Sequence, residues 1–220
     1  MEDPVPVRVR EYADQAVAYV RRALGMTLEY DSDTLPVLDH YLRTVTDGAQ
    51  AEALELVITT AGCYFGEVVR RRLGGRWEIT GRVEVDGDDR PPGSNEAEWR
   101  VVLPTGLNFS PLGFVAAAIA QGDVEEFDSE FDAPARMRPY VEQTLARMGE
   151  VPLEDYYSLC NRLDTLEHVH EVLVAVAAQM MGDVADPDAV PDGDDAPETA
   201  DVGETEPVVP ASDEPSGPVN

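Results

Sequence analysis

The spacing of the apolar residues changes at one point of this chain, and that change decides its class of fold. Up to Gly74 and Gly75, apolar residues recur three and four positions apart, which predicts a long helix over residues 49–73. From Trp77 to Val85, apolar and polar residues alternate, which predicts a half-buried strand. Two glycines between the helix and the strand suit a sharp change of chain direction. The sequence therefore predicts an α+β fold.

Other stretches predict further helices and strands. Helical spacing of apolar residues predicts helices over residues 8–24, about 33–45, 111–120, about 135–148 and about 153–180, the last with a break near Cys160 and Asn161. Alternation predicts a second strand at about 98–103, antiparallel to the first, and a short strand at 107–109. We expect an α+β domain in which five or six helices pack on a small antiparallel sheet of two to four strands.

Gly62 and Gly66 lie one turn apart in the long predicted helix. Each lowers helix propensity by about 1 kcal/mol relative to alanine. Small residues on one side of a helix let another element approach closely, and such packing would offset the lost propensity. We therefore expect a second element to lie against this side of the helix.

The composition changes at Asp183. Residues 183–220 contain seven prolines and 12 acidic residues, but no arginine and no aromatic residue. Such a segment cannot bury enough apolar surface to offset an ordering entropy of about 1–2 kcal/mol per residue. We predict one folded domain over residues 1–182 and a disordered, acidic, proline-rich tail over residues 183–220.

The chain has 44 acidic residues, 16 arginines and no lysine, which gives a formal net charge of −28. The tail accounts for only part of this charge, because residues 1–182 alone carry −16. Nucleic acids and anionic membranes bind through cationic side chains that release counterions, so we expect neither as a partner. A basic protein is the expected partner, although solubility alone would also explain the charge.

Two features predict the location and the source of the protein. The N-terminal residues are acidic and lack the apolar core of a secretory signal, and the longest apolar stretch, Phe114 to Ala120, is too short to cross a bilayer. We therefore expect a cytoplasmic protein. Arginine in place of lysine, with abundant Ala, Gly, Pro and Val, indicates a bacterium with GC-rich genes.

The sequence lacks the common patterns of catalytic and metal sites. Without lysine there is neither a P-loop nor a lysine Schiff base. Cys63 and Cys160 form no Cys-x-x-Cys pair, and no His-Glu-x-x-His is present. His168 and His170 would point about 200° apart on a helix, so they cannot share a metal ion. We assign no catalytic residue, no cofactor and no metal ligand from the sequence.

One segment resembles a group of bacterial proteins. Gly62-Cys-Tyr-Phe-Gly-Glu67, followed by Gly74-Gly-Arg-Trp77, is similar to a helix-to-strand segment in small bacterial α+β domains of unknown function. In these domains an Asn-x-x-Pro turn follows the sheet, and here such a turn runs from Asn108 to Pro111. The resemblance covers about residues 8–122 and implies a compact fold without a known activity.

Three residues in or near these motifs have two interpretations each. Glu67 and Asn108 either bind a ligand or satisfy backbone groups at the junction of helix and strand. Cys63 is either a small core residue or a nucleophile, and the second requires that a histidine folds against it. Glu67 is also placed to pair with Arg70 or Arg71 on the helix surface.

Residues 123–132, which we call the acidic–aromatic segment, combine carboxylates with aromatic rings. We predict that they form an extended surface segment and an interaction edge. The residues expected to make the contacts are Glu125, Glu126, Phe127 and Phe131. Carboxylates around aromatic rings would suit a basic partner.

Three hypotheses for the function follow. The first is a non-enzymatic bacterial protein, such as an adaptor, a regulator or an immunity-type protein, that contacts a basic partner protein. The second is a hydrolase that uses carboxylates or Cys63. The third is an acidic mimic of nucleic acid, which needs carboxylates spaced like phosphates on one face. We favour the first, because the sequence holds no complete catalytic set and its charge is strongly negative.

Overall fold

The structure, a computed structural model, describes residues 5–45, 50–81, 97–125 and 127–182. All of them belong to one unit of the chain. In this part of the chain, six helices of ten residues or more (α1 to α5 and α7) accompany a four-stranded antiparallel sheet, so the expected α+β class is confirmed. The predicted tail, residues 183–220, lies outside the described residues.

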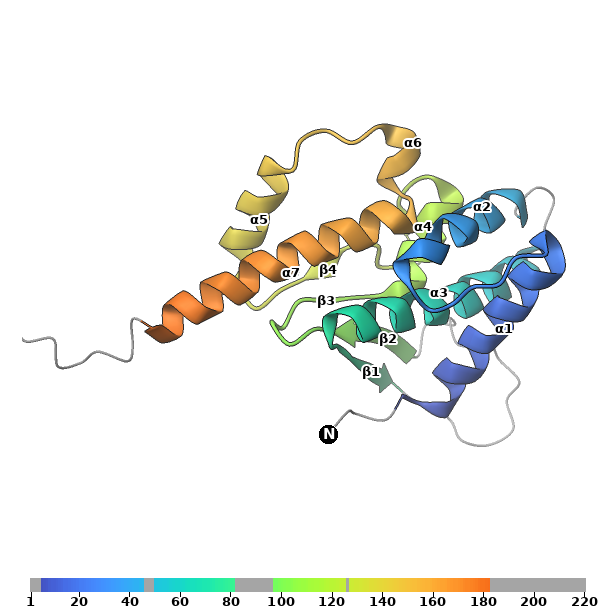
Figure 1. The fold of residues 1–220 in the computed structure, drawn as a ribbon, viewed down its shortest axis with the longest axis horizontal. Helices are drawn as coiled ribbons and strands as arrows, with labels where there is room; N and C mark the ends of the chain where they lie inside the picture. Colours follow the sequence, from blue (N-terminus) through green and yellow to red (C-terminus); the bar gives the residue numbers. More distant parts are fainter. Residues whose placement is uncertain (1–4, 46–49, 82–96, 126, 183–220) are drawn as a thin grey trace, which may run out of the picture. The chain divides into compact units, whose positions relative to one another are not determined.

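Figure 1 labels the elements along the chain. Their bounds are α1 (Val7–Leu24), a 3₁₀ helix (Ser32–Thr34), α2 (Leu35–Val45), α3 (Ala51–Leu73), β1 (Arg76–Gly81), β2 (Ala97–Val102), β3 (Asn108–Phe109), α4 (Pro111–Ala120), β4 (Phe131–Asp132), α5 (Arg138–Arg147), α6 (Leu153–Tyr156) and α7 (Leu159–Gly182). The predicted helices and the three predicted strands are therefore present, with ends that differ by a few residues.

The sheet has the order β1-β2-β3-β4, and every neighbouring pair is antiparallel. Trp77, Val101, Phe109 and Phe131 lie opposite one another in this order, so one row of apolar side chains crosses all four strands. Residues 82–85 of the predicted first strand lie outside the described part. The fourth strand was not predicted, and it turns the end of the acidic–aromatic segment into the edge of the sheet.

Other elements pack closely against Gly62 and Gly66 of α3, as the spacing of these glycines predicts. A Cβ atom at Gly62 would lie 2.9 Å from the backbone of Leu112 in α4. A Cβ atom at Gly66 would lie 2.9 Å from Pro111 and would overlap the ring of Trp77. The absence of side chains at these two positions lets α4 and β1 pack directly on the backbone of α3.

The N-terminus of α7 is held by a residue from α2. Asp39 is only 4% exposed, and its two carboxylate oxygens accept the backbone N–H groups of Leu159 (2.8 Å) and Cys160 (3.2 Å). The first turn of a helix leaves such N–H groups without partners, so the carboxylate acts as a cap from outside the helix. The break between α6 and α7 falls at residues 157 and 158, just before the predicted position.

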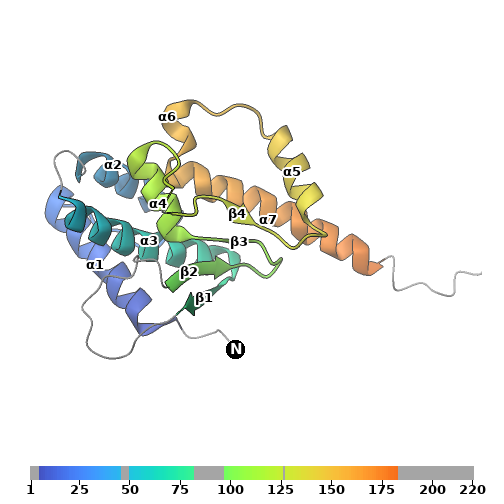
Figure 2. The same ribbon diagram turned by 180° about the vertical axis from the view of Figure 1, so that it is seen from behind.

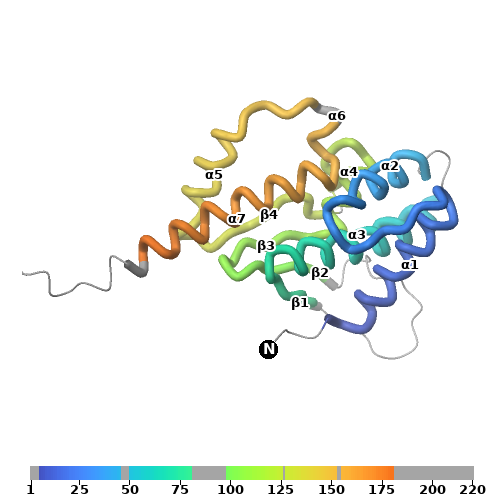
Figure 3. Tube along the Cα trace, viewed as in Figure 1, coloured from blue at the N-terminus to red at the C-terminus, as the bar shows by residue number. Residues whose placement is uncertain are grey.

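The arrangement of the elements places α5 beside α7. Figure 2 shows α1 and α2 at one end of the described part and α5 at the other, with α4 and the sheet between them. Along α7, contacts are made with α2, α3, α4 and α5. Figure 3 follows the chain from α5 over to α6 and back into α7. Because α5 packs on α7 in this way, the acidic–aromatic segment, α5 and the start of α7 can form the walls of one site.

Candidate functional site

Glu67 lies in the interior of the fold. Glu67 is 2% exposed, whereas pairing on the helix surface was expected. Its Oε1 accepts hydrogen bonds from Arg70 Nε (2.8 Å) and from the indole Nε1 of Trp77 (2.7 Å), and Arg71 Nε lies 3.5 Å from Oε2. The predicted pairing with Arg70 and Arg71 is present, but the carboxylate is buried instead of lying on the surface, because Trp77 and Arg70 cover it. Glu67 thus binds side chains at the helix–strand junction.

Cys63 is a core residue. Its side chain is completely buried, as the first of its two interpretations requires. Burial, and to a smaller extent the charge of Glu67, raises the pKa of the Cys63 thiol, so the reactive thiolate is disfavoured. Within the described residues, no histidine forms a hydrogen bond or ion pair with it. Cys63 therefore lacks the base that a nucleophile of this kind needs.

Asn108 ties three parts of the sheet together. Its Oδ1 accepts a hydrogen bond from Arg100 Nε at 2.8 Å, and its Nδ2 donates to the backbone oxygens of Gly106 (3.4 Å) and Asp132 (3.3 Å). Within the described residues, no hydrogen bond or ion pair joins Asn108 to Glu67 or Cys63, so these three residues do not form a common site. Asn108 thus satisfies two backbone oxygens of the sheet, instead of groups at the junction of helix and strand.

The acidic–aromatic segment is less open than the sequence indicates. Phe127 and Phe131 are partly buried and pack against the core, and Glu125 is exposed. Glu126 lies outside the described residues. The backbone of Asp128 rests directly on Gly113 of α4, where a Cβ atom would lie 2.5 Å from the Asp128 carbonyl carbon. The aromatic rings therefore fix the segment to the fold, and carboxylates make up most of its exposed face.

A pocket of about 440 Å³ opens beside this segment. One wall is formed by residues of the segment together with Ala133, a second by α5, and the third by α6 and α7. Two large apolar side chains of the lining are exposed, Leu145 at 39% and Tyr156 at 45%. Six lining side chains are charged: Asp123, Glu130, Asp132, Arg138, Glu142 and Arg162. The pocket thus combines apolar surface with charges of both signs.

Most charges in the pocket are exposed, but they differ in their partners. Asp132 pairs with Arg138 at 3.1 Å, and Asp123 accepts a hydrogen bond from the hydroxyl of Ser129 at 2.9 Å. The carboxylates of Glu130 and Glu142 have no hydrogen bond or ion pair with another described residue. These two carboxylates are therefore available to a cationic ligand.

Arg162 lines the pocket and, like Arg138, Glu142, Leu145 and Tyr156, was not predicted from the sequence. It is only partly exposed, and its guanidinium carbon lies 4.9 Å from the ring centre of Phe114, 5.2 Å from Tyr156 and 5.5 Å from Tyr157. A signal in the sequence could have found it. Arg162 is three residues after Leu159 and four before Leu166, so it falls on the buried stripe of α7.

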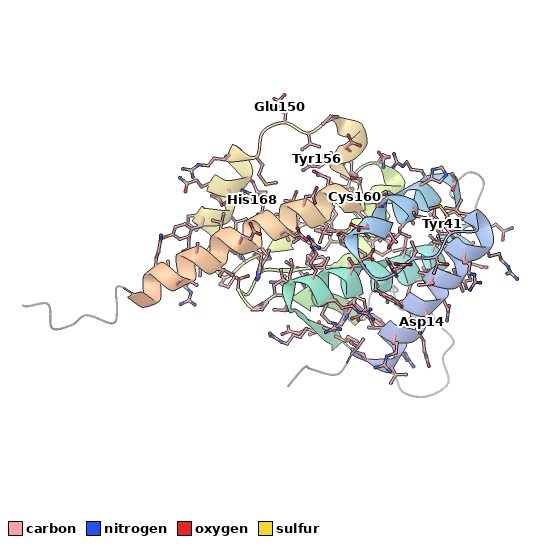
Figure 4. The ribbon with its side chains drawn as sticks, in the orientation of Figure 1. Asp14, Tyr41, Glu150, Tyr156, Cys160 and His168 are labelled. Atoms are coloured by element: carbon pink, nitrogen blue, oxygen red, sulfur yellow. The ribbon has the colours of Figure 1, made fainter. Side chains whose placement is uncertain are left out.

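The two neighbouring histidines lie outside the pocket. His168 is exposed on α7, which Figure 4 shows together with Tyr156 on α6 and Cys160 at the start of α7. His170 is half-buried, and its Nδ1 lies 3.0 Å from the hydroxyl of Thr105. Their separation on the helix agrees with the prediction. Nowhere in the described ranges do three residues of the types His, Cys, Asp and Glu stand close enough to hold a metal ion.

Comparisons with known proteins add no further assignment. No protein-family model matches the sequence, and no match was found among curated proteins or among solved structures. The resemblance to small bacterial α+β domains therefore rests on the residues that carry it. Among the described helices, none combines the length and the apolar character needed to cross a membrane.

Proposed function

We propose that this protein acts by binding another protein, and that a basic segment of the partner docks in the pocket beside the acidic–aromatic segment. The observation that carries the proposal is the pocket itself. Its four carboxylates outnumber its two arginines, and one of these arginines is already paired with Asp132. A cationic segment would therefore meet a site of opposite net charge.

The pocket also offers apolar surface for an anchoring side chain. Tyr156 and Leu145 are among the few large apolar side chains of the described chain that are exposed. Partly exposed aromatic residues supply much of the binding energy at protein interfaces. Exposed carboxylates around them mainly raise the association rate and the specificity. This combination supports recognition of a basic segment that also carries an apolar or long aliphatic side chain.

The net charge of the whole chain supports the same partner. Residues 1–182 carry −16, so a basic protein is attracted at long range and nucleic acid is repelled. We place this activity in the bacterial cytoplasm, as the composition predicts. The hydrolase hypothesis loses its named nucleophile, because Cys63 is buried. The hypothesis of a nucleic-acid mimic gains no specific observation from the described residues.

An NMR titration of the full chain tests the proposal. Three peptides of equal length and with free carboxyl ends, one basic, one neutral and one acidic, are added to the ¹⁵N-labelled protein. We expect the basic peptide to bind most tightly and to shift the resonances of residues that line the pocket. Binding should weaken when salt is raised, since exposed charges are screened within about 10 Å at 0.1 M salt.

A matched pair of double variants localises the binding. Glu130→Gln with Glu142→Gln removes two charges from the pocket, and Glu11→Gln with Glu52→Gln removes two exposed charges from α1 and α3. The first pair of substitutions should lower the affinity for the basic peptide several-fold, and the second pair should change this affinity much less. Equal effects of the two pairs would show that only the net charge attracts the peptide, and the proposed docking site would be abandoned.

A further inference from the structure

Arg162 carries a charge that the described chain does not satisfy. Its Nε is buried and has no hydrogen-bond partner, and no acidic side chain of the described residues forms an ion pair with its guanidinium group. Only one other buried side-chain nitrogen or oxygen in this part of the chain lacks a partner, Nε1 of Trp99, and that residue does not line the pocket. Arg162 therefore combines a buried donor without a partner with a place in the lining of the pocket.

The aromatic contacts of Arg162 do not replace a hydrogen-bond acceptor. Phe114, Tyr156 and Tyr157 surround the guanidinium and attract its positive charge. Rings of this kind leave the N–H donors in the guanidinium plane without acceptors. Burial lowers the pKa of Arg162, and Tyr156, Tyr157 and Asp123 offset part of this effect, but an arginine stays protonated near neutral pH.

The surroundings also hold the group in one place. Arg162 lies on the buried stripe of α7, between Leu159 and Leu166, and the three rings restrict its side chain. A guanidinium in a fixed position presents a fork of donors that matches a carboxylate. The carboxylates of the pocket that could serve as its partner are exposed, and those of Asp123 and Asp132 are already engaged.

We infer that Arg162 binds the C-terminal carboxylate of the basic segment, so that the partner docks by its chain end. The inference rests on the proposed function and specifies what its pocket recognises. The terminal carboxylate would reach the half-buried guanidinium, and a cationic side chain of the last residues would lie among Glu130 and Glu142. The volume of about 440 Å³ suits the last few residues of a chain, because small-ligand pockets begin at about 300 Å³.

The same chemistry, a carboxylate next to a cationic group, also occurs in a free basic amino acid. The experiment therefore has three arms on the full-length protein: a fluorescein-labelled peptide Gly-Ala-Arg-Ala-Arg with a free carboxyl end, the same peptide with an amidated end, and free L-arginine as a competitor. We expect the free acid to bind about tenfold more tightly than the amide, as for a hydrogen-bonded charge pair. Free arginine should compete only weakly, because it lacks the preceding residues.

Variants assign the difference between acid and amide to Arg162. Arg162→Gln should remove most of the preference for the free acid, and Arg162→Lys should keep only part of it, because lysine lacks the planar fork. Arg147→Gln, an exposed arginine of α5 that does not line the pocket, is the matched control and should leave the preference unchanged.

The outcomes separate this inference from the proposed function. If acid and amide bind the wild-type protein equally well, the carboxylate is not recognised and the inference is wrong, while the basic docking site stands. If neither peptide binds, the proposed function itself fails. If free arginine binds as tightly as the acid peptide, the pocket recognises an amino acid and the assignment to a chain end is overturned. The comparison of acid and amide needs no variant, so a poorly folded Arg162 variant would not obscure it.

Discussion

Substitution of Gly113 by alanine tests whether the acidic–aromatic segment is as tightly seated as the structure indicates. Gly113 lies in the first turn of α4, and its N–H donates to the hydroxyl of Ser110, which caps the helix. The backbone of Asp128 and Ser129 passes directly over its Cα atom. One methyl group at this position would therefore push the segment away from α4.

The geometry sets the size of the effect. A Cβ atom at Gly113 would overlap the carbonyl oxygen of Asp128 and would lie 2.5 Å from its carbonyl carbon and 3.2 Å from the backbone nitrogen of Ser129. Ordinary contacts between carbon atoms begin at about 3.5 Å, so the peptide group must move by about 1 Å. Added atoms in a packed interior cost about 1–3 kcal/mol, and an obstacle made of backbone falls at the upper end. Alanine returns about 1 kcal/mol of helix propensity. We expect a net loss of about 2 kcal/mol.

Thermal unfolding measures this loss. For a domain of this size, about 2 kcal/mol corresponds to a fall in Tm of roughly 4–8 °C. Gly122→Ala is the control, because a Cβ atom at Gly122 would come no closer than 3.9 Å to another atom beyond its neighbours, and it should leave the Tm nearly unchanged. A Gly113→Ala variant as stable as the wild type would refute the close contact between the segment and α4. The wall of the pocket would then not be fixed by packing.

Three further predictions concern buried polar groups. Asp39→Ala should lower the free energy of unfolding in urea by about 2 kcal/mol, because two N–H groups of α7 lose their acceptor, and Asp39→Asn should cost less. Glu67→Gln should cost about 1–3 kcal/mol in the same assay, because Arg70 loses a charged partner while the amide oxygen can still accept the indole N–H of Trp77. Burial lowers the pKa of His170, with a smaller opposite effect of Glu171. Above pH 6.5 the imidazole is neutral in both states. As the pH falls below 6.5, the imidazole of the unfolded chain takes up a proton before that of the folded chain. The free energy of unfolding therefore decreases between pH 6.5 and the lower pKa of His170 in the folded protein. The fall in Tm between pH 7.5 and pH 5.5 should therefore be smaller in His170→Gln, and an equal fall would contradict the assignment.

The periodic parts of the chain could be predicted because their signals are local. The helical spacing in α3 and the alternation in β1 and β2 each arise within one element, and the structure has a helix and two strands there. The spacing did not predict that residues 57–69 of α3 are buried on every side of the helix. Ser110 and Pro111 likewise mark the start of α4, where the Ser110 hydroxyl accepts the N–H of Gly113. By contrast, β4 has two residues, too few for any periodic signal, and it exists only because β3 pairs with it.

Contacts between distant parts of the chain were harder to predict, and the candidate site depends on such contacts. Asp39 binds backbone groups 120 and 121 residues away, and Arg72 pairs with Glu167 across 95 residues. Patterns in the sequence assign charged residues to the surface by default, and this default failed for Asp39, Glu67 and Arg162. The acidic–aromatic segment, predicted to be an interaction edge, forms one wall of the pocket. Of the predicted contact residues that the structure describes, only Phe131 lines the pocket, and Phe127 and Phe131 pack against the core.

Asp39, Glu67 and the partly buried Arg162 differ in one respect that bears on function. Asp39 and Glu67 are hydrogen-bonded inside the fold, so neither carboxylate needs a ligand as a partner. Arg162 does not, and a leucine there would continue the stripe from Leu159 to Leu166 and remove an unsatisfied charge. Apolar replacement of buried charges is often neutral or stabilising. We therefore expect Arg162→Leu to raise the free energy of unfolding by about 1 kcal/mol in urea, while the variant binds the acid and the amide peptide equally. A variant that is less stable than the wild type would mean that the contacts with the aromatic rings hold α7 in place, and Arg162 would then be a structural residue.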